Sequence, residues 1–164
     1  MGRTAFWRWP PFMIGPHRLL PGIAGIKHAA GSIDEDTVRL LADLPDRFAV
    51  LGGDDAFASP LHALGAAGAI LASAHVRTRD FAEMVRSWRG GECDRARALG
   101  HRLAGLSAAL FAEPNPVVIK AVLHAQGRIP SPAVRLPLLP ASPDATAVAL
   151  DHRGSAKSLK VTLG

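Results

Sequence analysis

Lys27 is the side chain best suited to chemistry in this sequence, because it follows the short apolar run at residues 23–26. Such a run is typical of a buried parallel strand, and α/β folds place their reactive groups at the carboxyl ends of these strands. A lysine amine attacks a ketone only when neutral, and apolar surroundings favour the neutral form. The resulting iminium ion stabilises a carbanion beside it. Lys27 is therefore a candidate for Schiff-base chemistry, although a lysine at a strand end is usually a solvated flank.

Gly53 and Ile70 are expected to lie beside Lys27. Gly53 follows the apolar run at residues 48–51, and Ile70 belongs to the run at residues 69–72. The handedness of parallel connections places consecutive strands side by side, so their carboxyl ends meet at one edge of the sheet. The sequence therefore predicts that Lys27, Gly53 and residues 70–73 lie together at the C-terminal edge of the strands. The alternatives are that Gly53 serves only a turn and that Ile70 only fills the core.

Helices alternate with these apolar runs along residues 22–90. Ser32 and Glu35 have the spacing of a capping box at the start of the first helix. An aspartate after Gly53 can cap the second helix, and a third helix is expected near residues 80–89. Apolar strands that alternate with helices predict a parallel sheet with helical cover.

The remainder of the chain is expected to be mainly helical. Helices are predicted at residues 92–111, from about 115 to 127, and at 143–150, with an extended proline-rich stretch at 130–140. The fold class is therefore α/β, with three βα units followed by a helical appendage. Three parallel strands do not close a barrel, which needs about eight.

The net charge of +5 resides in the two ends of the chain. Residues 1–20 carry three arginines and no acid, residues 151–164 carry a net +2, and residues 21–150 are neutral. A nucleic-acid-binding protein needs a basic face on its folded body, so this class is excluded. No apolar run approaches the roughly 20 residues of a membrane-spanning helix, so no membrane partner is expected.

The single cysteine, Cys93, rules out an internal disulfide framework and fits the reducing cytoplasm. It stands among polar residues in an expected helix, so we expect an unreactive surface thiol. The histidines are scattered and not spaced as ligands, so no metal site is expected. The apolar N-terminal segment at residues 6–14 contains two adjacent prolines at residues 10–11, which forbid a regular helix there.

Five short motifs occur in order along roughly residues 19–150. They are Gly25–Gly31 around Lys27, Val50–Ala56, Gly65–Ile70, Leu110–Pro116 with Lys120, and Val134–Leu138. In order and spacing they resemble the motifs of the dihydrodipicolinate synthase and N-acetylneuraminate lyase family.

This resemblance implies a (β/α)₈ (TIM) barrel lyase that binds pyruvate as an imine on Lys27 and needs no further cofactor. In the synthase branch, the derived enamine attacks aspartate semialdehyde on the route to lysine. Carried over residue by residue, Lys27 is the catalytic nucleophile, Ile70 lies close to pyruvate and acts largely through its backbone, and Gly53 forms part of the pocket wall. The expected partners are therefore small molecules, pyruvate and an aldehyde.

The sequence also departs from the family pattern. The Gly-Thr-Thr segment that grips the pyruvate carboxylate has no counterpart, and the chain contains no tyrosine to act as the family's proton shuttle. His75 stands where the family usually carries asparagine. We therefore expect an unmatched, disordered leader at residues 1–18, the last three βα units of a barrel at 19–90, a helical region at 91–150 and a basic tail at 151–164.

Two functions stay open on the sequence alone. The first is a lyase that is complete only if another polypeptide supplies the first strands of the barrel. The second is a truncated, non-catalytic paralogue or interaction module that associates with a full-length homologue. An open three-stranded parallel sheet exposes two edges and an apolar face, which favours homo- or hetero-oligomers.

Overall fold

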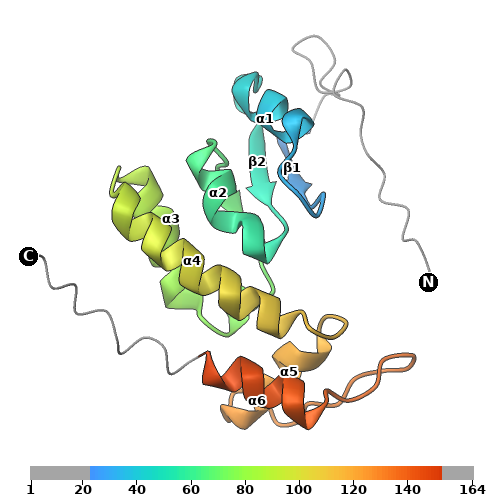
Figure 1. Ribbon diagram of the computed structural model, residues 1–164. Helices are drawn as coiled ribbons and strands as arrows, with labels where there is room; N and C mark the ends of the chain where they lie inside the picture. The colour runs from blue at the N-terminus through green and yellow to red at the C-terminus, as the bar shows by residue number, and fades with distance from the viewer. Residues whose placement is uncertain (1–22, 153–164) are drawn as a thin grey trace, which may run out of the picture.

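The computed structural model describes residues 23–152 of the chain. A three-stranded sheet lies at one end and a group of helices at the other (Figure 1). The expected leader and most of the expected basic tail lie outside the described residues. The elements, in chain order, are β1 (Gly25–His28), α1 (Glu35–Ala42), β2 (Ala49–Gly52), η2 (Asp55–Phe57), α2 (Ala58–Ala63), β3 (Gly68–Ala69), η3 (Ser73–His75), α3 (Thr78–Arg89), α4 (Cys93–Leu110), α5 (Val117–Ala125) and α6 (Pro143–Asp151).

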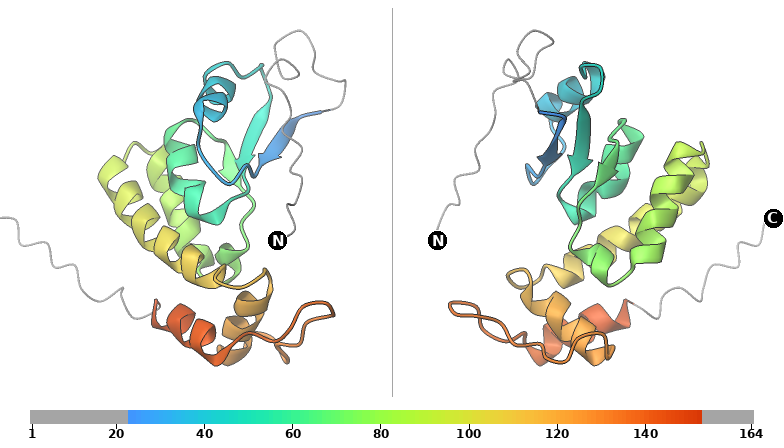
Figure 2. Two further views of the ribbon diagram at one scale, coloured as in Figure 1. Left: turned by 45° about the vertical axis from the view of Figure 1, so that its right-hand side comes forward. Right: turned by 180° about the vertical axis from the view of Figure 1, so that it is seen from behind.

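The three strands pair in chain order and are all parallel, as the sequence predicts. The register places Lys27 of β1 beside Leu51 of β2, and Leu51 beside Gly68 of β3. Helices α1 and α2 cover one side of the sheet, and no helix of the described chain covers the other (Figure 2). This arrangement is consistent with part of a parallel βα barrel.

The third strand is shorter than the apolar run predicts. β3 has two residues, whereas the expected strand ran on to residue 72. Ile70 still donates its N–H to the carbonyl of Gly52 at 2.8 Å, but the N–H of Ser73 turns to the carboxylate of Asp55. A side chain thus takes the place of a strand partner, and the chain leaves the sheet into η3.

The first helix begins two residues later than the capping-box spacing predicts. Asp34, and not Ser32, is its N-cap, and its side chain accepts the N–H of Thr37. Gly31 has a φ of +73°, so the chain turns there and Ser32 stays outside the helix. Aspartate is favourable at this position because its charge opposes the positive end of the helix dipole.

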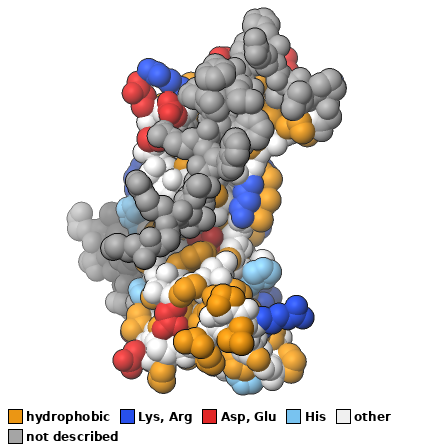
Figure 3. Space-filling model, turned by 90° about the vertical axis from the view of Figure 1, so that its right-hand side faces the viewer, with side chains coloured by type: hydrophobic (Ala, Val, Ile, Leu, Met, Phe, Trp, Pro, Cys, Tyr) orange, Lys and Arg blue, Asp and Glu red, His pale blue; other side chains and the backbone are white. Residues whose placement is uncertain are grey.

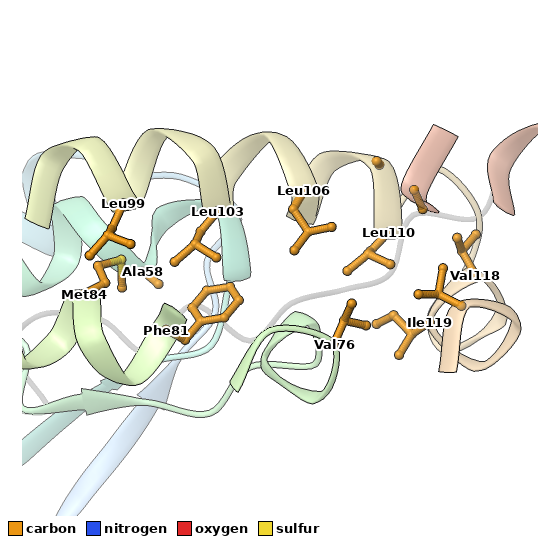
Figure 4. Close-up of a cluster of buried hydrophobic side chains, with 13 residues drawn as sticks. Ala58, Val76, Phe81, Met84, Leu99, Leu103, Leu106, Leu110, Val118 and Ile119 are labelled. Carbon is orange, nitrogen blue, oxygen red and sulfur yellow. The ribbon is translucent and has the colours of Figure 1, made fainter. Parts of the chain in front are cut away.

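The main hydrophobic core lies among the helices and not on the sheet. Four leucines of α4, at intervals of three or four residues, form one buried face (Figure 4). Each of these leucines is at most 5% exposed, and full burial of such a side chain contributes about 1.5–3 kcal/mol. The four leucines are Leu99, Leu103, Leu106 and Leu110, and their partners include Phe81, Met84, Val76, Val118 and Ile119.

A second, smaller cluster joins the sheet to its helices. Val50 of β2 and Leu61 of α2 are at its centre, with exposures of 0% and 1%. Leu41 of α1 adds to them. The helix-covered side of β2 is therefore buried, and α2 contributes to both clusters, with Leu61 in this one and Ala58 in the main core.

Gly100 allows α4 to approach α2. A Cβ at this position would lie 2.1 Å from the Oγ of Ser59. The same Oγ accepts the indole N–H of Trp88, from α3, at 3.0 Å. This three-helix contact connects the small sheet cluster to the main core.

Gly100→Ala should therefore lower the free energy of unfolding by about 1–3 kcal/mol, because a methyl group cannot fit against Ser59 without moving a helix. Gly105→Ala, on the same helix, is the matched control. Its Cβ would meet only the His152 ring, at 3.6 Å, so it should be neutral or stabilising by up to about 1 kcal/mol. Urea unfolding of both variants measures the difference, and equal stabilities would contradict the described helix contact.

His62 of α2 is a buried histidine that forms a hydrogen bond through one of its two ring nitrogens. The residue is 7% exposed, and Nδ1 donates to the carbonyl of Ala58 at 2.7 Å. Within residues 23–152, Nε2 has no hydrogen-bond partner. Burial lowers the pKa of His62, and the charge of Arg89 lowers it further against the opposing hydrogen bond to Ala58.

This lowered pKa makes part of the stability depend on pH. Below the unfolded value of 6.5, the unfolded chain takes up a proton that the folded chain resists. Stability is thus lost as pH falls from 6.5 toward the lowered folded pKa. His62→Phe should flatten this decline in thermal unfolding between pH 7 and 5, by roughly 1 kcal/mol or less. The exposed His101→Phe is the matched control for replacing a histidine with phenylalanine. A His62→Phe slope equal to that of wild type would contradict the assignment.

Candidate active site

Lys27 lies within β1 and points away from the helices. Side chains alternate along a strand, so Ile26 packs toward the α1 and α2 cluster and Lys27 takes the opposite face with its register partner Leu51. Lys27 is exposed. The apolar surroundings that the sequence suggested are therefore absent among the described residues, because no described element covers this face.

Gly53 provides the space that the Lys27 side chain occupies. Its N–H donates to the carbonyl of His28 at 2.6 Å, which holds the turn after β2 against the end of β1. A Cβ on Gly53 would lie 2.7 Å from Lys27 Cε and 2.8 Å from Ala29 Cβ. Gly53 is thus needed for close approach, which is a stricter requirement than the simple turn considered from sequence.

Ile70 lies at the same edge, one strand further along. Its N–H donates to Gly52, so its backbone sits directly beside the turn that contains Gly53. Its side chain is 53% exposed, so it does not fill the core of the described chain. The structure therefore brings Lys27, Gly53 and Ile70 together at one edge, as the sequence predicts.

Two aspartates of the same turn reach to the neighbouring loops, a feature that the sequence reasoning missed. Asp54 accepts the N–H of Gly31, in the loop after β1, at 2.8 Å. Asp55 accepts the N–H of Ser73, in the loop after β3, at 2.5 Å. Asp54 occupies the N-cap position of η2, as expected, but neither η2 nor α2 has a side-chain cap hydrogen bond. The adjacency of the two aspartates at a strand end was the available signal.

His28 follows Lys27 but belongs to the other face of the sheet. Its Nε2 lies 3.1 Å from the Oγ1 of Thr37. That hydroxyl donates its one hydrogen to Asp34 at 2.9 Å, so His28 Nε2 must be the donor. His28 therefore fastens β1 to α1 and is not placed to exchange protons with the Lys27 amine.

The remaining candidate positions lie apart from this edge. His75 is exposed at the end of η3, and Cys93 is an exposed free thiol at the start of α4. Within residues 23–152, no three His, Cys, Asp or Glu side chains gather as a metal-binding group. Across the same residues, no helix is both long and apolar enough to cross a bilayer. Two surface cavities, one beside Arg102 and one beside Lys120, are not lined by Lys27.

Solved structures of known proteins resemble the described fold. The chain superimposes on dihydrodipicolinate synthase from Thermotoga maritima with a TM-score of 0.75 at 28% identity, over 80% of this chain and 45% of that one. It superimposes on the chloride-inhibited enzyme from Acinetobacter baumannii, complexed with pyruvate, with a TM-score of 0.74 at 33% identity, over 82% and 47%. The described α/β fold, with its three-stranded parallel sheet, is thus similar to part of these synthases and consistent with part of a barrel.

The sequence comparison then identifies the family. The profile of the Dihydrodipicolinate synthetase family matches residues 13–150, and the chain belongs to that family. The 4-hydroxy-tetrahydrodipicolinate synthase of Syntrophobacter fumaroxidans is 38% identical over 142 residues, which are 87% of this chain and 48% of the relative. The synthase of Sorangium cellulosum is 41% identical over 74% of this chain and 40% of the relative. The chain thus spans about half the length of the relatives that it matches.

A double-mutant cycle tests the contact between Gly53 and Lys27. Gly53→Ala alone should destabilise the chain by about 1–3 kcal/mol, because its methyl group overlaps Lys27 Cε and Ala29 Cβ. Lys27→Ala removes one of these overlaps, so Gly53→Ala should cost less in that background. Strict additivity of the two unfolding free energies would mean that Lys27 does not lie over Gly53.

Proposed function

We propose that the chain is the pyruvate-binding part of a class I, Schiff-base lyase of the 4-hydroxy-tetrahydrodipicolinate synthase type. The observation that carries this proposal is the position of Lys27, on a parallel strand, against a glycine that leaves room for its side chain. Membership of the family supports it, as does the similar Acinetobacter enzyme, which is described as complexed with pyruvate.

Each site residue then has a distinct role. The Lys27 amine attacks the keto carbon of pyruvate and, with loss of water, forms an iminium ion. Loss of a methyl proton gives the enamine, which attacks the aldehyde, with aspartate semialdehyde as the proposed acceptor in lysine biosynthesis. Water finally releases the product and restores the amine. Gly53 keeps the space around Lys27 Cε open, and Ile70 offers its backbone beside the bound ketoacid. The imine itself is the electron sink, so no separate cofactor is involved.

Proton transfer is the step for which this chain is least equipped. The sequence has no tyrosine, and the nearest histidine, His28, faces the opposite side of the sheet in its bond to Thr37. A positioned acid or base commonly contributes about 10²–10⁴ in rate. We therefore propose that imine formation is within reach of the described residues and that condensation needs proton-transfer groups that this sequence does not contain.

Exposed apolar side chains support the second candidate function, an interaction module. Ile23 and Ile70, at the sheet, are 50% and 53% exposed, and Leu136 and Leu139, between α5 and α6, are 85% and 71% exposed. In Figure 3, hydrophobic side chains gather over the part of the molecule that holds α5, α6 and the segment between them. Apolar surface of this kind favours association with a second copy or with a full-length homologue.

Trapping with borohydride tests the proposed chemistry. The chain incubated with pyruvate and sodium borohydride should gain about 72 Da at Lys27, the mass of a reduced pyruvate imine. Peptide mapping by mass spectrometry locates the adduct. Lys27→Arg keeps the positive charge but cannot form the imine, and should abolish the adduct; Lys120→Arg is the control and should retain it. Equal labelling of Lys27 and Lys120 would show that Lys27 reacts only as an ordinary surface amine.

A further inference from the structure

We propose that Asp54 and Asp55 are positioning residues, which set the loops after β1 and β3 on either side of the turn that carries Gly53. Neither touches the proposed reacting atoms. Their effect on chemistry rests on the proposed function of Lys27, whereas their effect on the loops does not depend on it.

Asp54 restrains the loop that follows Lys27. Its carboxylate accepts the N–H of Gly31, four residues after the lysine, at 2.8 Å. Gly31 has a φ of +73°, a conformation that other residues adopt only with strain. The hydrogen bond therefore joins two turns that are 23 residues apart in the sequence. One is the turn at Gly31 after β1, and the other is the turn at Asp54 after β2.

Asp55 restrains the loop that contains Ile70, and does so in the protein interior. The Asp55 side chain is 6% exposed and Ser73 is 0% exposed. The segment from Ile70 to Ser73 is held at both ends. The N–H of Ile70 donates to the carbonyl of Gly52, and the N–H of Ser73 donates to the carboxylate of Asp55. Because a buried N–H without a partner is costly, removal of the Asp55 carboxylate should release this loop more strongly than removal of Asp54 releases the other.

Both hydrogen bonds start from the turn after β2, so both affect the position of Gly53 relative to the neighbouring loops. Asp54 and Asp55 directly follow Gly53, whose missing side chain accommodates Lys27. The separation between the Lys27 amine and the Ile70 backbone is thus set by one dipeptide, whose two carboxylates point to opposite neighbours. Loss of either bond should alter that separation without changing the chemistry of the lysine itself.

Amide hydrogen exchange of the full chain, followed by NMR, tests the restraints directly. In Asp54→Ala the Gly31 amide, and in Asp55→Ala the Ser73 amide, should exchange about tenfold faster or more, with the α4 amides unchanged. The asparagine variants keep an acceptor oxygen and should restore much of the protection. Asp94→Ala is the control, since this aspartate is 98% exposed. The proposal would be overturned if the Gly31 and Ser73 amides exchanged no faster in the alanine variants than in Asp94→Ala.

The rate of pyruvate trapping on Lys27 tests the consequence. Each alanine variant should be trapped several-fold more slowly than wild type, and each asparagine variant at closer to the wild-type rate. Faster loop exchange with an unchanged trapping rate would show that the carboxylates are structural only, and would overturn the positioning role. Absence of the adduct in the wild-type chain would refute the proposed function instead, and the exchange measurement would still decide whether the loops are held.

Discussion

The close packing of Lys27 against a glycine is the contact on which the candidate site depends. With any other residue at position 53, a Cβ would lie 2.7 Å from Lys27 Cε and 3.0 Å from the carbonyl of His28. The turn Gly52–Asp55 can approach β1 only because that Cβ is absent. The same turn accepts the N–H of Ile70 and carries the two carboxylates that reach the flanking loops. One short turn after the central strand therefore sets the geometry of the whole sheet edge.

This edge is supported from the helical side. The large core belongs to α3, α4 and α5 and includes little of the sheet. The sheet is attached through Val50 and Leu61, and α2 in turn is attached through the contact of Ser59 with Gly100. The opposite side of the sheet, which carries Lys27, has no described helix against it (Figure 2). The described residues thus hold the backbone of Lys27 in a paired strand, while its side chain is exposed.

Much of the fold could be predicted from the sequence, because the signals were local and repeated. The apolar runs and handedness rules predicted three parallel strands in chain order and a shared edge for Lys27, Gly53 and Ile70. Details that depend on tertiary hydrogen bonds could not be predicted. β3 ends early because Asp55 takes the N–H of Ser73. Asp34 caps α1 because the chain turns at Gly31 and leaves Ser32 outside the helix. The exposure of Lys27 depends on what covers the sheet, which no local pattern records.

The most direct measurement is the nuclear Overhauser contact between the Lys27 side chain and the turn after β2. The account predicts strong cross-peaks from the Lys27 ε-methylene protons to the Gly53 α-protons and to the Ala29 methyl group, with the two ε-protons resolved by the chiral packing around them. Cross-peaks from Lys27 only to its sequence neighbours, with degenerate ε-protons, would contradict it. In that case the lysine would extend freely into solvent, and Gly53 would serve its turn alone.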